Sequence, residues 1–172
     1  MTVRVSASVV LRAKPEDAFA SMADPRAQEK WIFATTMYAV ESSASPPQVG
    51  ARIAAFTGFW SIGFLDTMTV TAYDPTRRWV MDKDGALLHG TGIMQVEPLP
   101  GGCRATWTNE LELPFGVLGR LGWPLARPLA RLALTAALRR MGRLLQRGVL
   151  PLSPAPDPEL TTVRRPDQIL PA

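Results

Sequence analysis

The chain has 172 residues, of which 47% are hydrophobic and 20% are charged, and its formal net charge is +4. This length suits one globular domain that needs no disulfide or metal to fold, and the composition excludes fibrous and wholly disordered proteins. A single cysteine, Cys103, excludes an intramolecular disulfide and favours a reducing compartment. The N-terminus lacks the continuous apolar core of a secretory signal, and no apolar stretch approaches the roughly 20 residues that cross a bilayer. We therefore expect a cytoplasmic protein.

The first part of the chain predicts one strand and two short helices. Apolar and polar residues alternate over residues 2–12, as in a strand with one buried face. Pro15 and two acidic residues then begin a helix over residues 15–23. Asp24 has the position of an N-cap for a second helix that ends near Trp31.

Six further strands follow, separated by turns rich in glycine, proline and aspartate. They are predicted over residues 35–41, 51–59, 65–73, 78–83, 87–97 and 103–113. Strands at this spacing form an antiparallel meander.

The period of the apolar residues then becomes helical over residues 115–148. We expect the unbroken helix to begin near Pro124 or Pro128, because each proline removes a backbone donor. We expect residues 1–148 to form the domain and the Pro-rich residues 149–172 to form an extended or disordered tail.

Several short motifs resemble those of the START-like superfamily, also called SRPBCC, which includes the polyketide cyclase/dehydratase group. The motifs are Pro15-Glu16-Asp17-Ala18-Phe19, Met22-Ala23-Asp24-Pro25, Trp31, Val49-Gly50-Ala51-Arg52, Tyr73-Asp74-Pro75 and Arg78-Trp79. The resemblance implies an α+β helix-grip fold, in which a curved antiparallel sheet of about seven strands wraps around a long C-terminal helix. It also implies a cavity between sheet and helix. It leaves the function open, because the superfamily includes lipid carriers, cyclases and hydrolases.

Strand parity predicts which side chains face that cavity. The inward sets are Asp66, Met68, Val70 and Ala72 on one strand, and Cys103, Ala105, Trp107, Asn109, Leu111 and Leu113 on the last strand. A buried Asn109 must be hydrogen-bonded to core groups, water or a ligand. Asp66 ends its strand, so it is either a solvated carboxylate at the rim or an inward acid, base or polar anchor.

His89 is the only histidine and the obvious acid/base candidate, yet its parity places it on the outer face. A bulge at Gly90 or Gly92 would invert that register. We keep Asp66, Asn109 and His89 as catalytic candidates. The sequence shows neither metal-ligand spacing nor a Gly-rich phosphate loop, so we expect no metal and no cofactor.

The predicted ligand contacts combine strand and helix residues. They are Phe59, Trp60, Met68, Val70, Met94, Trp107, Asn109, Leu125, Leu129 and Leu132. Phe59 and Trp60 lie in a glycine-flanked hairpin, which suits the mouth of a cavity. The leucines belong to a helical stripe that we expect to face the sheet. Beyond Ala136 the apolar stripe changes phase, so either the helix bends or its last turns project past the sheet.

The long helix is also strongly basic, with seven arginines and no acidic residue from Arg120 to Arg147. Its end, with Arg139, Arg143 and Arg147, suits an anionic membrane surface, a protein partner or a second copy of the chain. The alternative is a solvated face whose alkyl stems cover apolar surface. No base-reading motif accompanies the charge, so we do not expect a nucleic-acid partner.

Three functions are compatible with these patterns. We favour a non-enzymatic binder or carrier of a small hydrophobic molecule, lipid-like or polyketide-like, because the inward strand faces are apolar. The second is a cyclase, aromatase or dehydratase type of enzyme acting on a hydrophobic ketone, in which Asp66, Asn109 or His89 assists proton transfer. The third is an interaction module that works through the basic helix.

Overall fold

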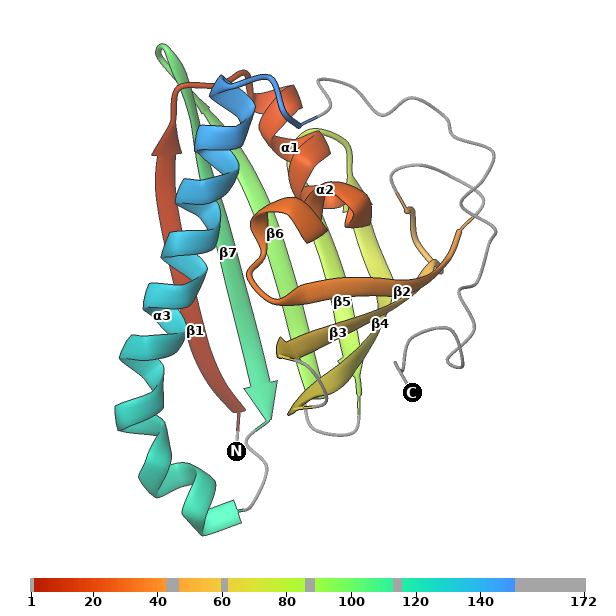
Figure 1. The fold of residues 1–172 in the computed structure, drawn as a ribbon, viewed down its shortest axis with the longest axis vertical. Coiled ribbons are helices and arrows are strands. Elements are labelled where there is room, and N and C mark those ends of the chain that lie inside the picture. Colours follow the sequence, from red (N-terminus) through yellow and green to blue (C-terminus); the bar gives the residue numbers. More distant parts are fainter. Residues whose placement is uncertain (1, 43–46, 60–61, 86–88, 113–115, 151–172) are drawn as a thin grey trace.

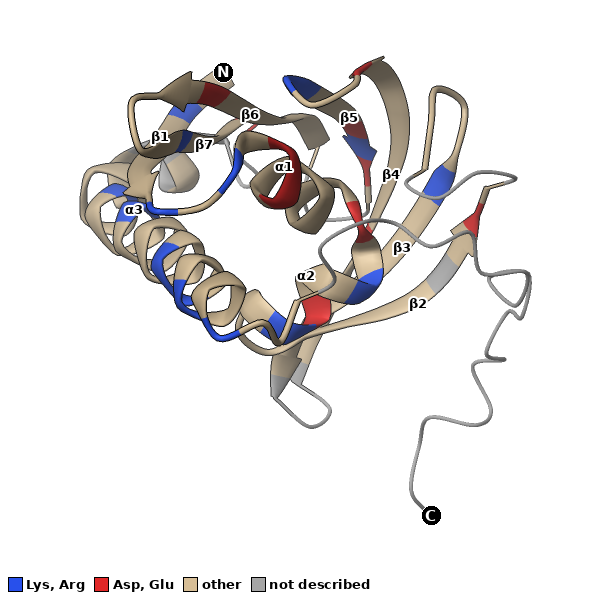
Figure 2. Ribbon diagram, turned by 90° about the horizontal axis from the view of Figure 1, so that it is seen from above, with Lys and Arg blue, Asp and Glu red and all other residues tan. Residues whose placement is uncertain are grey.

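The computed structural model describes residues 2–42, 47–59, 62–85, 89–112 and 116–150. In this part of the chain, a curved seven-stranded antiparallel sheet is covered on one face by two short helices and one long helix (Figure 1). The view from above in Figure 2 shows the sheet as an open half-barrel, with α3 running beside β1. This arrangement confirms the expected helix-grip fold.

The elements follow one another as the sequence predicted. They are β1 (Thr2–Leu11), α1 (Pro15–Ala23), α2 (Pro25–Trp31), β2 (Thr35–Glu41), β3 (Arg52–Phe59), β4 (Ile62–Asp74), β5 (Arg78–Asp84), β6 (His89–Leu99), β7 (Gly102–Glu112) and α3 (Gly116–Gln146). The expected start of α3 was wrong, because the helix begins before Pro124 and contains both that residue and Pro128. Proline inside a helix is accommodated by bending, and Figure 1 shows α3 curving in its N-terminal half.

Strands β2 to β7 form a meander, and β1 joins the free side of β7, so the order is β1-β7-β6-β5-β4-β3-β2. The pairing of β4 with β5 shifts register between Val70 and Ala72. The extra residue reverses the alternation of side chains. Ala72 is therefore exposed, which corrects the prediction that it faces inward with Val70.

Local hydrogen bonds hold α1 and α2 together, and a ring contact of Trp31 joins them to the sheet. Oδ1 of Asp24 accepts a hydrogen bond from the backbone N of Arg26 at 2.9 Å, which is the predicted N-cap of α2. Trp31 at the end of α2 is 0% exposed and donates its ring N–H to the carbonyl of Ser21 at 3.0 Å. Its ring meets that of Trp107 on β7 edge to face, with centroids 5.7 Å apart.

The C-terminal half of α3 packs on the sheet. Its buried side chains are Leu134, Ala137, Leu138, Met141 and Leu145. Leu150, beyond the helix, is also buried in the core, so packing continues past residue 148. The tail predicted for residues 149–172 lies outside the described residues from 151 onward. No helix in the described ranges is long and apolar enough to cross a bilayer.

Candidate functional site

The inner face of the sheet, on which the helices pack, is mainly apolar. Its buried side chains alternate with outward ones and include Met68 and Val70 on β4, Trp79 and Met81 on β5, Met94 and Val96 on β6, and Cys103 and Ala105 on β7. Trp107 is half-buried and packs against the same core. A surface of this kind favours apolar groups, because their burial removes them from water.

Among the described residues of this face, three polar side chains lie close together: Asp66 on β4, Lys83 on β5 and Asn109 on β7. Nζ of Lys83 forms an ion pair with Oδ2 of Asp66, and the two side chains are only 10% and 9% exposed. Asp66 is therefore an inward, paired carboxylate and not a solvated group at the rim. Burying an isolated carboxylate costs several kcal/mol, so the Lys83 ammonium is what permits this position.

Lys83 was absent from the sequence-based candidates, although a signal for it was present. It follows Trp79 and Met81 at intervals of two residues, and both of those side chains face inward. Parity alone therefore places Lys83 on the inner face. Its partner depends on the β4–β5 register, in which Lys83 lies opposite Met68, two residues from Asp66 on the same face.

Gly92 on β6 provides the space into which these side chains extend. It pairs with Met81 on one neighbouring strand and with Asn109 on the other. A Cβ atom at position 92 would lie 3.4 Å from Oδ1 of Asn109 and 3.5 Å from Cε of Lys83. Lys83 and Asn109 thus approach the same point from the strands on either side of β6. We refer to Asp66, Lys83, Gly92 and Asn109 as the inner polar cluster.

The inner polar cluster contains two oxygen atoms without a hydrogen-bond partner in the described part of the chain. They are Oδ1 of Asp66 and Oδ1 of Asn109, and both atoms are buried. Such an atom costs about 1–3 kcal/mol when it stays unsatisfied, and buried polar atoms almost always have a partner. Both oxygens accept hydrogen bonds, and the Lys83 ammonium has donors beyond the one that Asp66 uses. The cluster can therefore bind a hydroxyl through its acceptors or a carbonyl through Lys83.

His89 does not belong to this cluster. It begins β6, it is exposed, and its strand parity matches the predicted outward face. Phe59 and Trp60 were predicted to lie at the mouth of the cavity. Trp60 and the side chain of Phe59 lie outside the described residues. Among the described residues, no three His, Cys, Asp or Glu side chains are grouped so as to hold a metal ion.

Cys103 lies inward, as parity predicted, and is 0% exposed. Burial raises the pKa of its thiol, and the negative charge of Glu16 adds to that effect. A raised pKa lowers the fraction of thiolate, which is the reactive form. Cys103 therefore acts as a small apolar core residue.

The expectation that Leu125, Leu129 and Leu132 face the sheet was wrong, because their side chains are exposed by 79%, 68% and 63%. A helix turns about 100° per residue, which places Leu125 and Leu132 roughly opposite Met141. Because the Met141 side is buried against the sheet and the short helices, the leucine side of the same helix faces outward.

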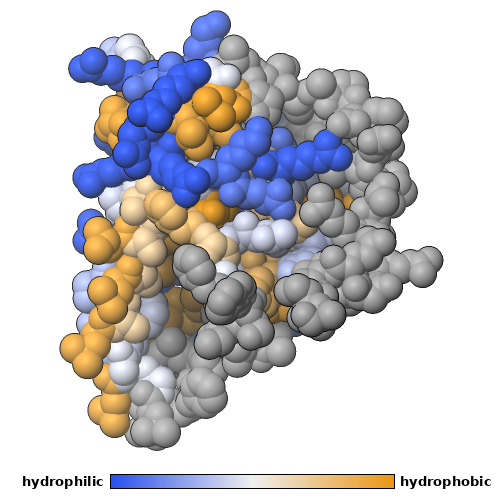
Figure 3. Space-filling view, viewed as in Figure 1, coloured by the Kyte–Doolittle hydropathy of each residue, from blue (hydrophilic) through white to orange (hydrophobic). Residues whose placement is uncertain are grey.

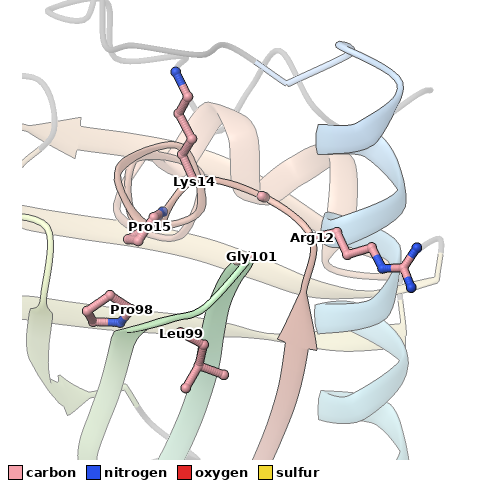
Figure 4. Close-up of a pocket in the computed structure, with 8 residues that line it drawn as sticks. Arg12, Lys14, Pro15, Pro98, Leu99 and Gly101 are labelled. Carbon is pink, nitrogen blue, oxygen red and sulfur yellow. The ribbon is translucent and has the colours of Figure 1, made fainter.

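A recess of about 470 Å³ lies where β1 leads into α1, beside the turn between β6 and β7. Its lining includes Arg12, Lys14, Pro98 and Leu99. Figure 4 shows the side chains of Arg12 and Lys14 pointing away from the recess, with Arg12 directed toward α3. The charged groups of this lining thus do not converge, in contrast to those of the inner polar cluster.

Comparisons with known proteins agree with this fold. Residues 2–146 match the family described as polyketide cyclase / dehydrase and lipid transport. The uncharacterized protein Rv2574 of Mycobacterium tuberculosis is 29% identical over 143 residues, which cover 79% of this chain and 80% of that protein. The fold is similar to that of TTHA0849 from Thermus thermophilus, with a TM-score of 0.66 and 16% identity over 85% of this chain and 99% of that chain. It is also similar to StfQ, a di-domain ARO/CYC protein from the steffimycin biosynthetic pathway, with a TM-score of 0.70 and 12% identity over 86% of this chain and 52% of that chain.

Proposed function

Because the chain belongs to the polyketide cyclase / dehydrase and lipid transport family, we propose that it binds a small hydrophobic molecule against the inner face of the sheet. The inner polar cluster recognises a hydroxyl or carbonyl group of that molecule. The observation that carries the proposal is the pair of buried acceptors, Oδ1 of Asp66 and Oδ1 of Asn109, on an otherwise apolar face. A ligand that donates to them satisfies atoms that the described residues leave unpartnered.

The two parts of the site contribute differently. Apolar contact stabilises the complex by about 25 cal/mol for each Å² removed from water, and it discriminates little between ligands of similar shape. The polar cluster discriminates, because a ligand without a matching group leaves buried polar atoms unsatisfied. One such mismatch costs about 1–3 kcal/mol, which corresponds to an affinity difference of roughly 5- to 150-fold.

The test compares two probes that differ by one hydroxyl group, naphthalene and 2-naphthol, in equilibrium dialysis with the full chain. We expect 2-naphthol to bind about tenfold more tightly. In Asn109→Leu we expect that preference to fall while naphthalene binding is retained. His89→Leu is the matched control, because His89 is exposed and lies outside the cluster. Binding of neither probe, or an unchanged preference in both Asn109→Leu and Asp66→Leu, contradicts the proposal.

One observation also favours a second function, proton transfer to a bound ketone as in a cyclase or dehydratase. Lys83 occupies Oδ2 of Asp66 and leaves Oδ1 unpartnered, so one carboxylate oxygen can take up a proton. The ammonium of Lys83 can stabilise negative charge that develops on the ketone oxygen. His89 is too exposed to share this site. Replacement of both Asp66 and Asn109 by alanine, with a demonstrated turnover left intact, would exclude this function.

A further inference from the structure

The N-terminal half of α3 exposes an apolar strip. Leu121, Leu125, Leu129 and Leu132 follow one another at intervals of three or four residues and are exposed by 71%, 79%, 68% and 63%. We call these four residues the leucine strip. In Figure 3 the corresponding apolar surface runs along the lower part of α3. Four large apolar side chains exposed together on one helix face mark a surface that binds a membrane or another molecule.

The same side of α3 becomes basic farther along the helix. A turn of about 100° per residue aligns Arg139 and Arg143 with Leu121 and Leu125. Both arginines are exposed, and Figure 3 shows the upper part of α3 as hydrophilic. A single outward face thus carries leucines over one half of its length and arginines over the other.

A groove between this helix face and β1 joins the two halves. It has a volume of about 650 Å³, and its lining includes Val9, Val10, Arg12, Leu132, Arg139 and Arg143. Arg12 reaches the groove from the end of β1, as its direction in Figure 4 indicates. The lining therefore combines apolar strand and helix side chains with three cations and no acidic side chain.

The charge of the face is unbalanced. Helix α3 contains arginines and no acidic residue, and Figure 2 shows its basic positions spread along its length. Within the described ranges, no ion pair involves Arg12, Arg139 or Arg143. Arg140 lies on another side of the helix, where its guanidinium stacks over the ring of Phe33 at 4.9 Å. A partner that binds this face must therefore carry negative charge near the arginines and apolar groups near the leucines.

We propose that the outer face of α3 docks onto an anionic lipid bilayer. The leucine strip enters the boundary between headgroups and acyl chains, while Arg12, Arg139 and Arg143 contact lipid phosphates around the groove. A second copy of the chain fits less well. A two-fold contact through the leucine strip would cover the leucines but leave Arg139 and Arg143, on the same side of the helix, without an acidic residue on the partner helix to pair with them.

The test is flotation of the full chain with two kinds of vesicle. One contains phosphatidylcholine alone, and the other contains equal parts of phosphatidylcholine and phosphatidylglycerol. We expect binding to the anionic vesicles only, and release when salt rises from about 0.1 M to about 1 M, which shortens the Debye length from about 10 Å to about 3 Å. Arg139→Glu/Arg143→Glu should weaken binding at least about twentyfold. Leu125→Ser/Leu129→Ser should weaken it at least about tenfold.

The matched control is Arg77→Glu/Arg78→Glu, which reverses two exposed charges at the start of β5, away from α3. This variant should bind vesicles as the unaltered chain does. Asn109→Leu should also bind them normally, so failure of the inner site is distinguishable from failure of the membrane contact. Equal binding to both vesicle types, or no binding to either, overturns the proposal. So does a dimer in light scattering that Leu125→Ser/Leu129→Ser dissociates without changing vesicle binding.

Discussion

Gly142 of α3 packs directly against Leu11 of β1. A Cβ atom at position 142 would lie 2.6 Å from Cδ2 of Leu11, so the helix approaches the strand more closely there than any other residue type permits without a shift. This contact holds the C-terminal half of α3 in one rotation about its axis. That rotation buries Leu138 and Met141 and leaves the leucine strip outward.

Alanine at Gly142 and at Gly122 should therefore have different effects, although both glycines lie in α3. Nothing lies within 4 Å of a Cβ atom at Gly122, so Gly122→Ala should stabilise the protein by about 0.5–1 kcal/mol through helix propensity. Gly142→Ala gains the same propensity but displaces Leu11, and overpacking costs about 1–3 kcal/mol. Urea unfolding measures both free energies. Equal values for the two variants would show that Leu11 does not restrict position 142.

Removal of one member of the Asp66–Lys83 pair should be costly. Lys83→Met leaves a buried carboxylate without its cation, and we expect a loss of about 3–5 kcal/mol in the free energy of unfolding. The double variant Asp66→Leu/Lys83→Met removes both charges and should recover most of that loss, because buried ion pairs are often replaceable by apolar residues. A double-mutant cycle in urea gives the coupling. Additive effects would contradict the ion pair.

Substitutions at Gly92 should distinguish effects on folding from effects on ligand binding. A Cβ atom there makes ordinary contacts of 3.4–3.5 Å with Asn109, Lys83 and Met81, so Gly92→Ala should fold normally. Gly92→Leu places a large side chain where Lys83 and Asn109 converge, and we expect 2-naphthol binding to fall at least about tenfold. Circular dichroism checks the fold, and dialysis checks the binding. If Gly92→Leu is folded and binds the probe fully, the ligand site lies elsewhere.

Asp24 should make stability depend on pH. Burial raises the pKa of its carboxyl above the ordinary value of 3.8, although hydrogen bonds from the backbone of Arg26 and Ala27 act in the opposite direction. The folded state therefore holds this proton more tightly than the unfolded state. The resulting stabilisation is full below the unfolded pKa and is lost as pH rises through the folded pKa.

Asp24→Asn keeps an N-cap acceptor and cannot titrate. The free energy of unfolding of the unaltered chain, minus that of Asp24→Asn, should therefore decrease from about pH 3 to about pH 6. Urea titrations across this range measure the difference, in which the other groups cancel. A difference that increases with pH would mean that the capping hydrogen bonds outweigh the burial of the carboxyl.

Local patterns in the sequence were sufficient for the elements, the fold and part of the site. Period-two alternation and turn residues place the strands, Asp24 and Pro25 begin α2, and parity puts Asp66 and Asn109 on the inner face, because each of these features depends on neighbours in the chain. Parity failed at Ala72, where one extra residue in the β4–β5 pairing reverses the alternation.

The tertiary structure decided the partners and the rotation of α3. Asp66 meets Lys83 only because the register of β4 with β5 makes them diagonal neighbours on the same face. The apolar residues of α3 lie on one side of the helix before Ala136 and on another side beyond it, so the sequence allows either side to be buried. The contact of Gly142 with Leu11 helps to determine which side is buried. The sequence by itself thus determined a sheet with two inward polar residues and a basic, leucine-rich helix. Which polar groups meet, and which leucines face outward, depends on contacts between residues far apart in the chain, which local periodicity does not encode.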